Sequence, residues 1–184
     1  IAVDEALLGG LRWRAIGPAV LGGRVSDVTG VPGNPNILYV GFASAGLWKS
    51  LDGGISFESI FESGNTLSVG AIAVAPDNPS VIYVGTGEGK PRNSTSFGDG
   101  IYRCLDGGKA WEHLGLSRTE PFSRLTIHPR DSKIIYAAAM GHEWGANEER
   151  GVYRTTDAGK TWTRVLFVNP TTGASDLAID ASNP

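Results

Sequence analysis

A short motif that recurs three times in phase constrains the fold of this 184-residue chain more than any other feature. In each copy an Asp is followed two residues later by Gly and five residues later by an aromatic residue. The copies are Ser50–Phe57, Cys104–Trp111 and Thr155–Trp162, and their aspartates lie 54 and 51 residues apart. Repeats at a fixed period of about 20–50 residues are typical of solenoids and propellers. The repeat therefore determines the architecture.

A second pattern recurs in register with the motif. Each motif is preceded by a turn residue and an apolar run that ends near a Tyr. These segments are Asn34–Val40, Asn78–Val84 and Asp131–Ala137. Around the first copy we predict four strands, Arg24–Val31, Ile37–Ala43, Gly46–Ser50 and Phe57–Glu62. Four short strands per period are typical of a propeller blade, and the 3.6-residue apolar spacing of a helical solenoid is absent. We predict an all-β propeller of four-stranded antiparallel blades.

The phase also predicts the domain organisation. After an N-terminal extension at 1–10, residues 11–184 form a partial propeller with about three complete blades, at approximately 22–64, 65–120 and 121–172, and the start of another at 173–184. Residues 11–17 are predicted to be the outer strand of the last blade, because Trp13–Ile16 matches the other fourth strands. A ring typically needs four to eight blades. We therefore expect other blades of the same polypeptide, or other subunits, to complete it.

The repeated motif suits a tight hairpin turn between the third and fourth strands. The Asp carboxylate accepts backbone N–H groups that the turn leaves unpaired, Gly supplies a positive φ, and the aromatic side chain packs into the core. We interpret the aspartates as structural rather than catalytic. The residues given this role are Ser50, Asp52, Gly54, Phe57, Asp106, Gly108, Trp111, Thr155, Asp157, Gly159 and Trp162.

These motifs resemble the Asp-boxes of the BNR-repeat β-propeller proteins, which include sialidases, xyloglucan-type glycoside hydrolases and the sortilin (Vps10) domain. The resemblance covers nearly all of the chain from Leu11 onward and is carried by Trp13–Pro18, Ala45–Ser50, Gly85–Glu88, Gly98–Arg103 and Gly141–Arg154. The chain looks most like large bacterial proteins described as glycosyl hydrolase BNR-repeat or sortilin-like. The resemblance implies an exported bacterial protein, located in the periplasm, on the cell surface or outside the cell.

Loop length indicates which face of the propeller carries function. In a four-stranded meander the 2–3 and 4–1 connections lie on one face, and the motif turns lie on the other. The 2–3 loop is long at 87–99 and 141–150 and short in blade one, so we call the first face the loop-rich face. Extra loop length on one face of a repeat protein commonly marks a binding face. The alternative is that these loops cap neighbouring blades or contact another domain.

The first strands are expected to line the central channel. One aligned position carries Asp27, Ala71, Arg124 and Asp176, and the next carries the predicted core residues Val28, Ile72, Leu125 and Leu177. The charged set could bind a polar ligand, but a structural ion-pair network is favoured. The ligand-binding candidates are Arg24, Asp27, Glu88, Arg92, Asp99, Arg124, His142, Glu143, Trp144 and Asp176.

Composition limits the partners and chemistries. A net charge of −3 gives no reason to expect nucleic acid as a partner, and no apolar stretch approaches the roughly 20 residues that span a bilayer. The spacing of His142, Glu143 and Glu148 matches no tight metal-ligand motif, and no phosphate loop or nucleophile elbow occurs. We expect neither a metal nor a cofactor.

The favoured prediction is a non-catalytic binding or interaction propeller, part of a larger exported protein, that recognises a glycan or a protein through the loop-rich face. The alternative is a glycoside hydrolase of the BNR-repeat type whose acids are completed by other blades. Asp27, Glu88 and Glu143 are the candidate acids, although no spacing selects a pair. Two departures count against an enzyme: no Arg-Ile-Pro motif of sialidases occurs, and Ala43 replaces the acid expected in xyloglucan-active relatives.

Overall fold

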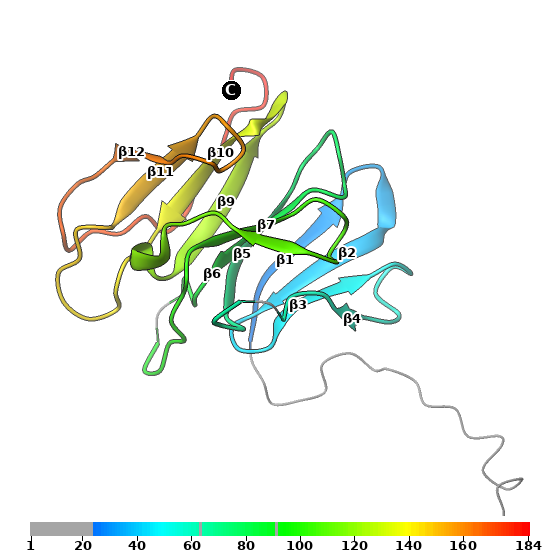
Figure 1. Ribbon diagram of the computed structural model, residues 1–184, viewed down its shortest axis with the longest axis horizontal. Helices are drawn as coiled ribbons and strands as arrows, with labels where there is room; N and C mark the ends of the chain where they lie inside the picture. The colour runs from blue at the N-terminus through cyan, green and yellow to red at the C-terminus, as the bar shows by residue number, and fades with distance from the viewer. Residues whose placement is uncertain (1–23, 63, 91) are drawn as a thin grey trace, which may run out of the picture.

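The computed structural model describes residues 24–62, 64–90 and 92–184, and it contains three four-stranded antiparallel sheets (Figure 1). Blade one contains β1 (Val25–Val31), β2 (Asn34–Phe42), β3 (Gly46–Ser50) and β4 (Glu58–Ser59). Blade two contains β5 (Val69–Val74), β6 (Ile82–Thr86), β7 (Ile101–Cys104) and β8 (Trp111–His113). Blade three contains β9 (Phe122–His128), β10 (Asp131–Ala139), β11 (Gly151–Thr155) and β12 (Thr163–Leu166). The predicted all-β fold with four-stranded antiparallel blades is confirmed.

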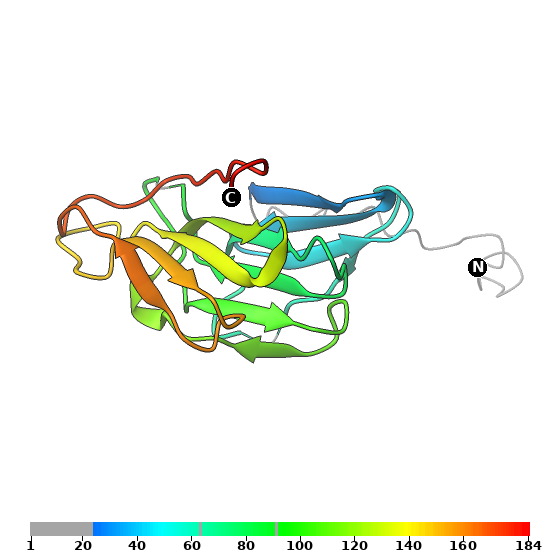
Figure 2. The ribbon, with the colours of Figure 1, turned by 90° about the horizontal axis from the view of Figure 1, so that it is seen from above.

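Each blade is a meander in which neighbouring strands are also consecutive in the chain. A short 3₁₀ turn, η1 (Ser117–Thr119), connects blade two to blade three. Figure 2 shows the segment 173–184 (red) running along one edge of the molecule toward β1 (blue). None of the described helical turns is long and apolar enough to cross a membrane.

Two details of the strand prediction were wrong. The fourth strand of blade one has only the two residues Glu58 and Ser59, whereas Phe57–Glu62 was predicted. The second strand starts at Asn34, three residues before the predicted start. The chain after β4 leaves the sheet early, although the backbone N–H of Ile60 still donates to the carbonyl of Leu47 at 2.9 Å. The predicted outer strand Trp13–Ile16 and the extension at 1–10 lie outside the described residues.

Two apolar layers hold the blades together. Between blades one and two, alternate residues such as Tyr39 and Leu47 pack on Val69 and Ile72, all at most 4% exposed. Between blades two and three, Tyr83, Phe122, Leu125 and Tyr153 belong to a second cluster. Side chains on one face of a strand recur every second residue, so the sheet of blade two contributes one of its faces to each layer.

One predicted core residue, Val28, is 56% exposed. It occupies on β1 the position that Ile72 and Leu125 occupy on β5 and β9, and those two side chains are each only 4% exposed. Ile72 packs against blade one and Leu125 against blade two. Among the described residues no sheet packs on the corresponding face of blade one, so Val28 stays open to solvent. Leu177 is half-buried.

The three motif turns, which we call the Asp turns (Ser50–Phe57, Cys104–Trp111 and Thr155–Trp162), share one hydrogen-bond pattern. In the first, Asp52 Oδ1 accepts the backbone N–H groups of Ile55 and Ser56 at 3.0 and 2.9 Å. The Ser50 hydroxyl donates to Asp52 Oδ1 and accepts the N–H of Gly54, both at 2.8 Å. In the second turn the Cys104 thiol replaces this hydroxyl and donates to Asp106 Oδ1 at 2.9 Å.

These hydrogen bonds make the stability of the folded chain depend on pH. The hydroxyl and backbone N–H of Ser56 hold the pKa of Asp52 at about 2, and those of Thr161 hold the pKa of Asp157 at about 2. An unfolded Asp has a pKa of about 3.9. The stability contributed by both carboxylates is therefore fully present above about pH 4 and is lost as the pH falls toward 2. The double variant Asp52→Asn, Asp157→Asn should flatten the fall of the urea midpoint across this range. An unchanged slope would contradict the assignment.

Candidate functional site

A groove with a volume of about 620 Å³ opens on the loop-rich face between the 2–3 loops of blades two and three. We call it the loop groove. Blade two contributes one wall, the connection between blades two and three contributes the floor, and the long loop of blade three contributes the other wall. Its lining is Glu88, Asn93, Ser94, Thr95, Ser96, Phe97, Glu120, Pro121, Met140, Gly141, His142, Glu143, Trp144, Arg150 and Thr171.

The blade-three wall is built around Arg150, whose side chain is buried (8% exposed) and points into its own loop. Its guanidinium donates to the carbonyl of Pro170 at 2.8 Å, to those of His142 and Gly145 at 2.6 and 3.1 Å, and to that of Met140. The Pro170 carbonyl also accepts the backbone N–H of Asn147 at 2.8 Å, so the loop is tied at two points to the segment after β12. Arg150 therefore fixes the shape of this wall.

Gly141 makes the tight approach of Arg150 to its loop possible. Its φ is +77°, which L side chains rarely adopt, and a Cβ there would lie 2.4 Å from Arg150 Cγ. The same Cβ would lie 2.5 Å from the side-chain oxygen of Asn147, which is 8% exposed. Gly141 and Arg150 thus form one packed unit beneath the loop surface.

Three carboxylates line the loop groove, and each already has a partner. Glu88 is 5% exposed at its side chain, pairs with the Arg24 guanidinium and accepts the backbone N–H of Ser96 at 3.3 Å. Glu143 accepts a hydrogen bond from the Thr95 hydroxyl across the groove. Glu120 lies 3.3 Å from His142 Nε2, so a protonated His142 would form an ion pair with it.

Two aromatic side chains flank these carboxylates at the surface. Trp144 is 77% exposed and Phe97 is 60% exposed. Large aromatic side chains usually bury most of their area, so an exposed pair beside a polar groove makes this surface a candidate for binding. The other described tryptophans differ, because the indole N–H groups of Trp48, Trp111 and Trp162 donate to backbone carbonyls.

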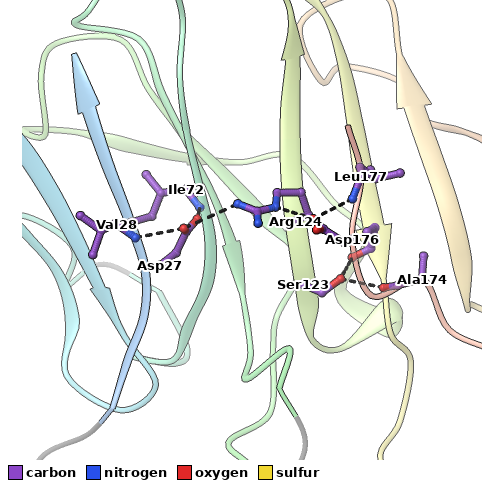
Figure 3. A network of polar contacts seen from close by, with 9 residues as sticks. Asp27, Val28, Ile72, Ser123, Arg124, Ala174, Asp176 and Leu177 are labelled. Carbon is purple, nitrogen blue, oxygen red and sulfur yellow. Dashed lines mark hydrogen bonds and ion pairs between the residues drawn. The ribbon is translucent and has the colours of Figure 1, made fainter. Parts of the chain in front are cut away.

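The predicted charges of the channel form a single network (Figure 3). Arg124 lies between two aspartates, with its Nε 2.8 Å from Asp176 Oδ1 and its Nη1 3.8 Å from Asp27 Oδ1. Asp27 Oδ2 also accepts the backbone N–H of Ile72 at 2.8 Å. The carboxylate of Asp176 raises the pKa of Arg124, and in turn Arg124 lowers the pKa of Asp176. The network links the first strands of blades one, two and three with the segment 173–184.

The structure separates the predicted site residues into groups. Glu88, His142, Glu143 and Trp144 line the loop groove. Arg24 reaches it only through its pair with Glu88, and Asp27, Arg124 and Asp176 belong to the channel network. Asp99 lies elsewhere, where its carboxylate accepts hydrogen bonds from Asn65 and from the Tyr102 hydroxyl, both at 2.8 Å. Arg92 is exposed and outside the groove lining.

The structure also adds residues that the sequence analysis did not nominate. Glu120 lies in the 4–1 connection after η1, has a positive φ of 51° and lines the loop groove. The meander rule places 4–1 connections on the loop-rich face, and this rule is the sequence signal that points to Glu120. Thr95, Phe97 and Arg150 lie inside the two long loops, and nothing in the sequence distinguishes a clamping Arg from an exposed one. Among the described residues no group of His, Cys, Asp and Glu is placed to hold a metal.

Comparison with known proteins finds similarity to larger propeller proteins. No family model matches the chain. A xyloglucanase from Paenibacillus is 32% identical over 91 residues, which cover 42% of this chain and 8% of that protein. The crystal structure of an ancestral GH74 enzyme is 27% identical and covers 79% of this chain and 19% of its own, with a TM-score of 0.57.

Two further structures show likeness of fold alone. The GH74 xyloglucanase from Xanthomonas campestris is 19% identical, with a TM-score of 0.57 over 84% of this chain and 22% of its own. YCF48 bound to D1 peptide is 14% identical, with a TM-score of 0.55 over 80% of this chain and 42% of its own. The chain therefore spans less than half of each of these four proteins, and it has the propeller fold of GH74 xyloglucanases and YCF48.

Proposed function

We propose that this chain is part of a larger exported propeller protein that binds a glycan chain in the loop groove without cleaving it. The observation that carries the proposal is the groove itself, about 620 Å³ in volume, with exposed Trp144 and Phe97 beside partnered carboxylates. Ligand sites combine apolar surface with a few placed polar groups. The 32% identity to a xyloglucanase over 91 residues supports a glycan as ligand.

The chemistry of the groove fits a neutral sugar polymer. A pyranose presents an apolar face of C–H groups, which can lie on the exposed Trp144 ring, and hydroxyl groups at its rim. Glu143 and Glu120 carry carboxylate oxygens that accept hydroxyl hydrogen bonds, and the mixed backbone and hydroxyl groups of Asn93–Ser96 extend the same polar surface.

Titration calorimetry tests this proposal. The chain should bind soluble xyloglucan oligosaccharides, and Trp144→Ala should weaken binding by about 10-fold or more, since a central Trp is a typical hot spot. Ile55→Ala is the matched control, because Ile55 is also 77% exposed but lies in an Asp turn on the opposite face. Equal binding by both variants would contradict a site at the loop groove.

A hydrolase is the second candidate, because three carboxylates share one groove and the similar proteins include xyloglucanases. Hydrolysis needs two carboxyls about 5–5.5 Å or 6.5–9.5 Å apart. Asp27 is poorly placed for this role, since both of its oxygens accept backbone N–H groups, from Val28 and Ile72. The test is an assay for reducing ends released from xyloglucan. Release by the wild-type chain that is abolished by Glu143→Gln or Glu120→Gln would establish a hydrolase and contradict binding without cleavage.

A further inference from the structure

One histidine of this chain faces the loop groove, and it lies against a carboxylate. The chain has three histidines, His113, His128 and His142, and of these His142 lines the groove. Its Nε2 lies 3.3 Å from Glu120 Oε1, and the two side chains are 44% and 35% exposed. Histidine side chains change charge between about pH 5 and 8. As the pH falls through this range, the contact of a neutral ring with a carboxylate becomes an ion pair.

The backbone on each side of this contact is held by close packing. The His142 carbonyl accepts the Arg150 guanidinium at 2.6 Å. The Glu120 carbonyl oxygen packs on Gly98, where a Cβ would lie 2.4 Å from it. The two side chains therefore face one another from fixed segments, and the ion pair forms without rearrangement of either segment.

The Glu120 carboxylate differs from the other two carboxylates of the groove in its partner. Among the residues that the structure describes, His142 is the one group that pairs with Glu120. Glu143 accepts the Thr95 hydroxyl, which does not change charge with pH. A sugar hydroxyl that donates to Glu120 therefore competes with a single group, and that group titrates.

The other charges around His142 are already engaged. From blade two the groove presents Glu88, which is paired with Arg24. From the loop of His142 itself come Glu143 and the Arg150 guanidinium, which is bonded to backbone carbonyls. The pair across the groove floor is thus the contact in the lining that a proton on the imidazole strengthens.

We propose that His142 and Glu120 form a proton-operated latch, through which acid weakens the binding of a neutral glycan in the loop groove. A hydrogen bond between charged groups is roughly twice as strong as a neutral one. The sugar hydroxyl must displace this stronger donor when His142 is protonated, and a neutral glycan gains no charge attraction from the imidazolium in return. The latch rests on the proposed function, because it acts on a glycan bound in the same groove.

Calorimetry at two pH values tests the effect on binding. From pH 8 to pH 6 the dissociation constant of a xyloglucan oligosaccharide should rise by about 3-fold in the wild type, the scale of a partly exposed ion pair. In His142→Gln it should be equal at both pH values, because Gln does not titrate. The matched control is His128→Gln, at the end of β9 away from the groove, which should keep the wild-type dependence on pH.

A measurement without ligand separates the latch from the proposed function. In a ¹³C-labelled chain, the carboxylate signal of Glu120, assigned with Glu120→Gln, should move between pH 8 and pH 6 in the wild type and stay fixed in His142→Gln. Absence of binding at both pH values would contradict the proposed function, but not the pair if the Glu120 signal still moves. The latch is overturned if that signal moves equally in both chains, or if the wild type binds the glycan equally at both pH values.

Discussion

Arg150→Ala is expected to destabilise the chain by about 2–4 kcal/mol and to abolish ligand binding in the loop groove. The buried guanidinium donates to the carbonyls of Pro170, Met140, His142 and Gly145. Its loss removes a donor from the half-buried carbonyls of Met140 and His142, at roughly 1–3 kcal/mol each. The Pro170 carbonyl keeps the backbone N–H of Asn147, and Gly145 is exposed to water. The loop that carries Trp144 would lose its fixed shape. Urea unfolding measures the first effect and calorimetry measures the second.

The control variant is a change at Arg154, which lies four residues further along the chain, on β11. Arg154 is exposed, so Arg154→Ala should change the free energy of unfolding by no more than about 0.5 kcal/mol. Arg150→Lys keeps the charge but cannot reproduce the planar fork of donors, and it should resemble Arg150→Ala more than wild type. Similar stability of wild type and Arg150→Ala would show that the loop is held by other contacts.

Gly70→Ala is the second large effect that we expect, a loss of about 3 kcal/mol. Gly70 lies in β5, where blade two meets blade three beneath the loop groove. A Cβ there would lie 2.1 Å from the carbonyl oxygen of Phe122 and 2.4 Å from that of Gly87. Both neighbours are backbone atoms, so relief requires the first strands to move apart, and overpacking of this kind commonly costs about 1–3 kcal/mol or more.

Gly30→Ala is the matched comparison in another first strand. A Cβ at Gly30 would meet only ordinary contacts, with Leu38 at 3.6 Å, so the change in thermal midpoint should be small. Gly70→Ala should lower the midpoint by many degrees and should also loosen the groove, because Gly87 begins the blade-two wall. Equal midpoints for the two variants would contradict the close approach of β5 and β9.

The fold was predictable because its determinants are local and repeated. Asp52, Asp106 and Asp157 recur with Gly and an aromatic residue at fixed offsets, which fixes one hairpin in every blade and, through the period, the strand count. Val28 shows where this reasoning stops. Its pattern matches that of Ile72 and Leu125, but burial depends on a packed neighbour, and periodicity within one strand carries no information about that neighbour.

The candidate site was predictable only to the level of a face and two loops. The sequence indicated the 2–3 loops of blades two and three, and Glu88, His142, Glu143 and Trp144 do line the loop groove. It could not separate Asp99, which bonds to Asn65 and Tyr102, from the groove residues, because loop backbones follow no period. The identity of a charged residue also did not predict its burial, because Arg150 is buried and Arg154 is exposed.

The indole N–H resonance of Trp144 gives the most direct test that the loop groove is the glycan site. The indoles of Trp48, Trp111 and Trp162 are bonded to backbone carbonyls within the fold, whereas Trp144 is 77% exposed at the groove. In a titration of ¹⁵N-labelled chain with a xyloglucan oligosaccharide, the Trp144 signal, assigned with Trp144→Phe, should shift in a saturable manner while those three stay fixed. Saturable binding that leaves the Trp144 signal unmoved would contradict the account.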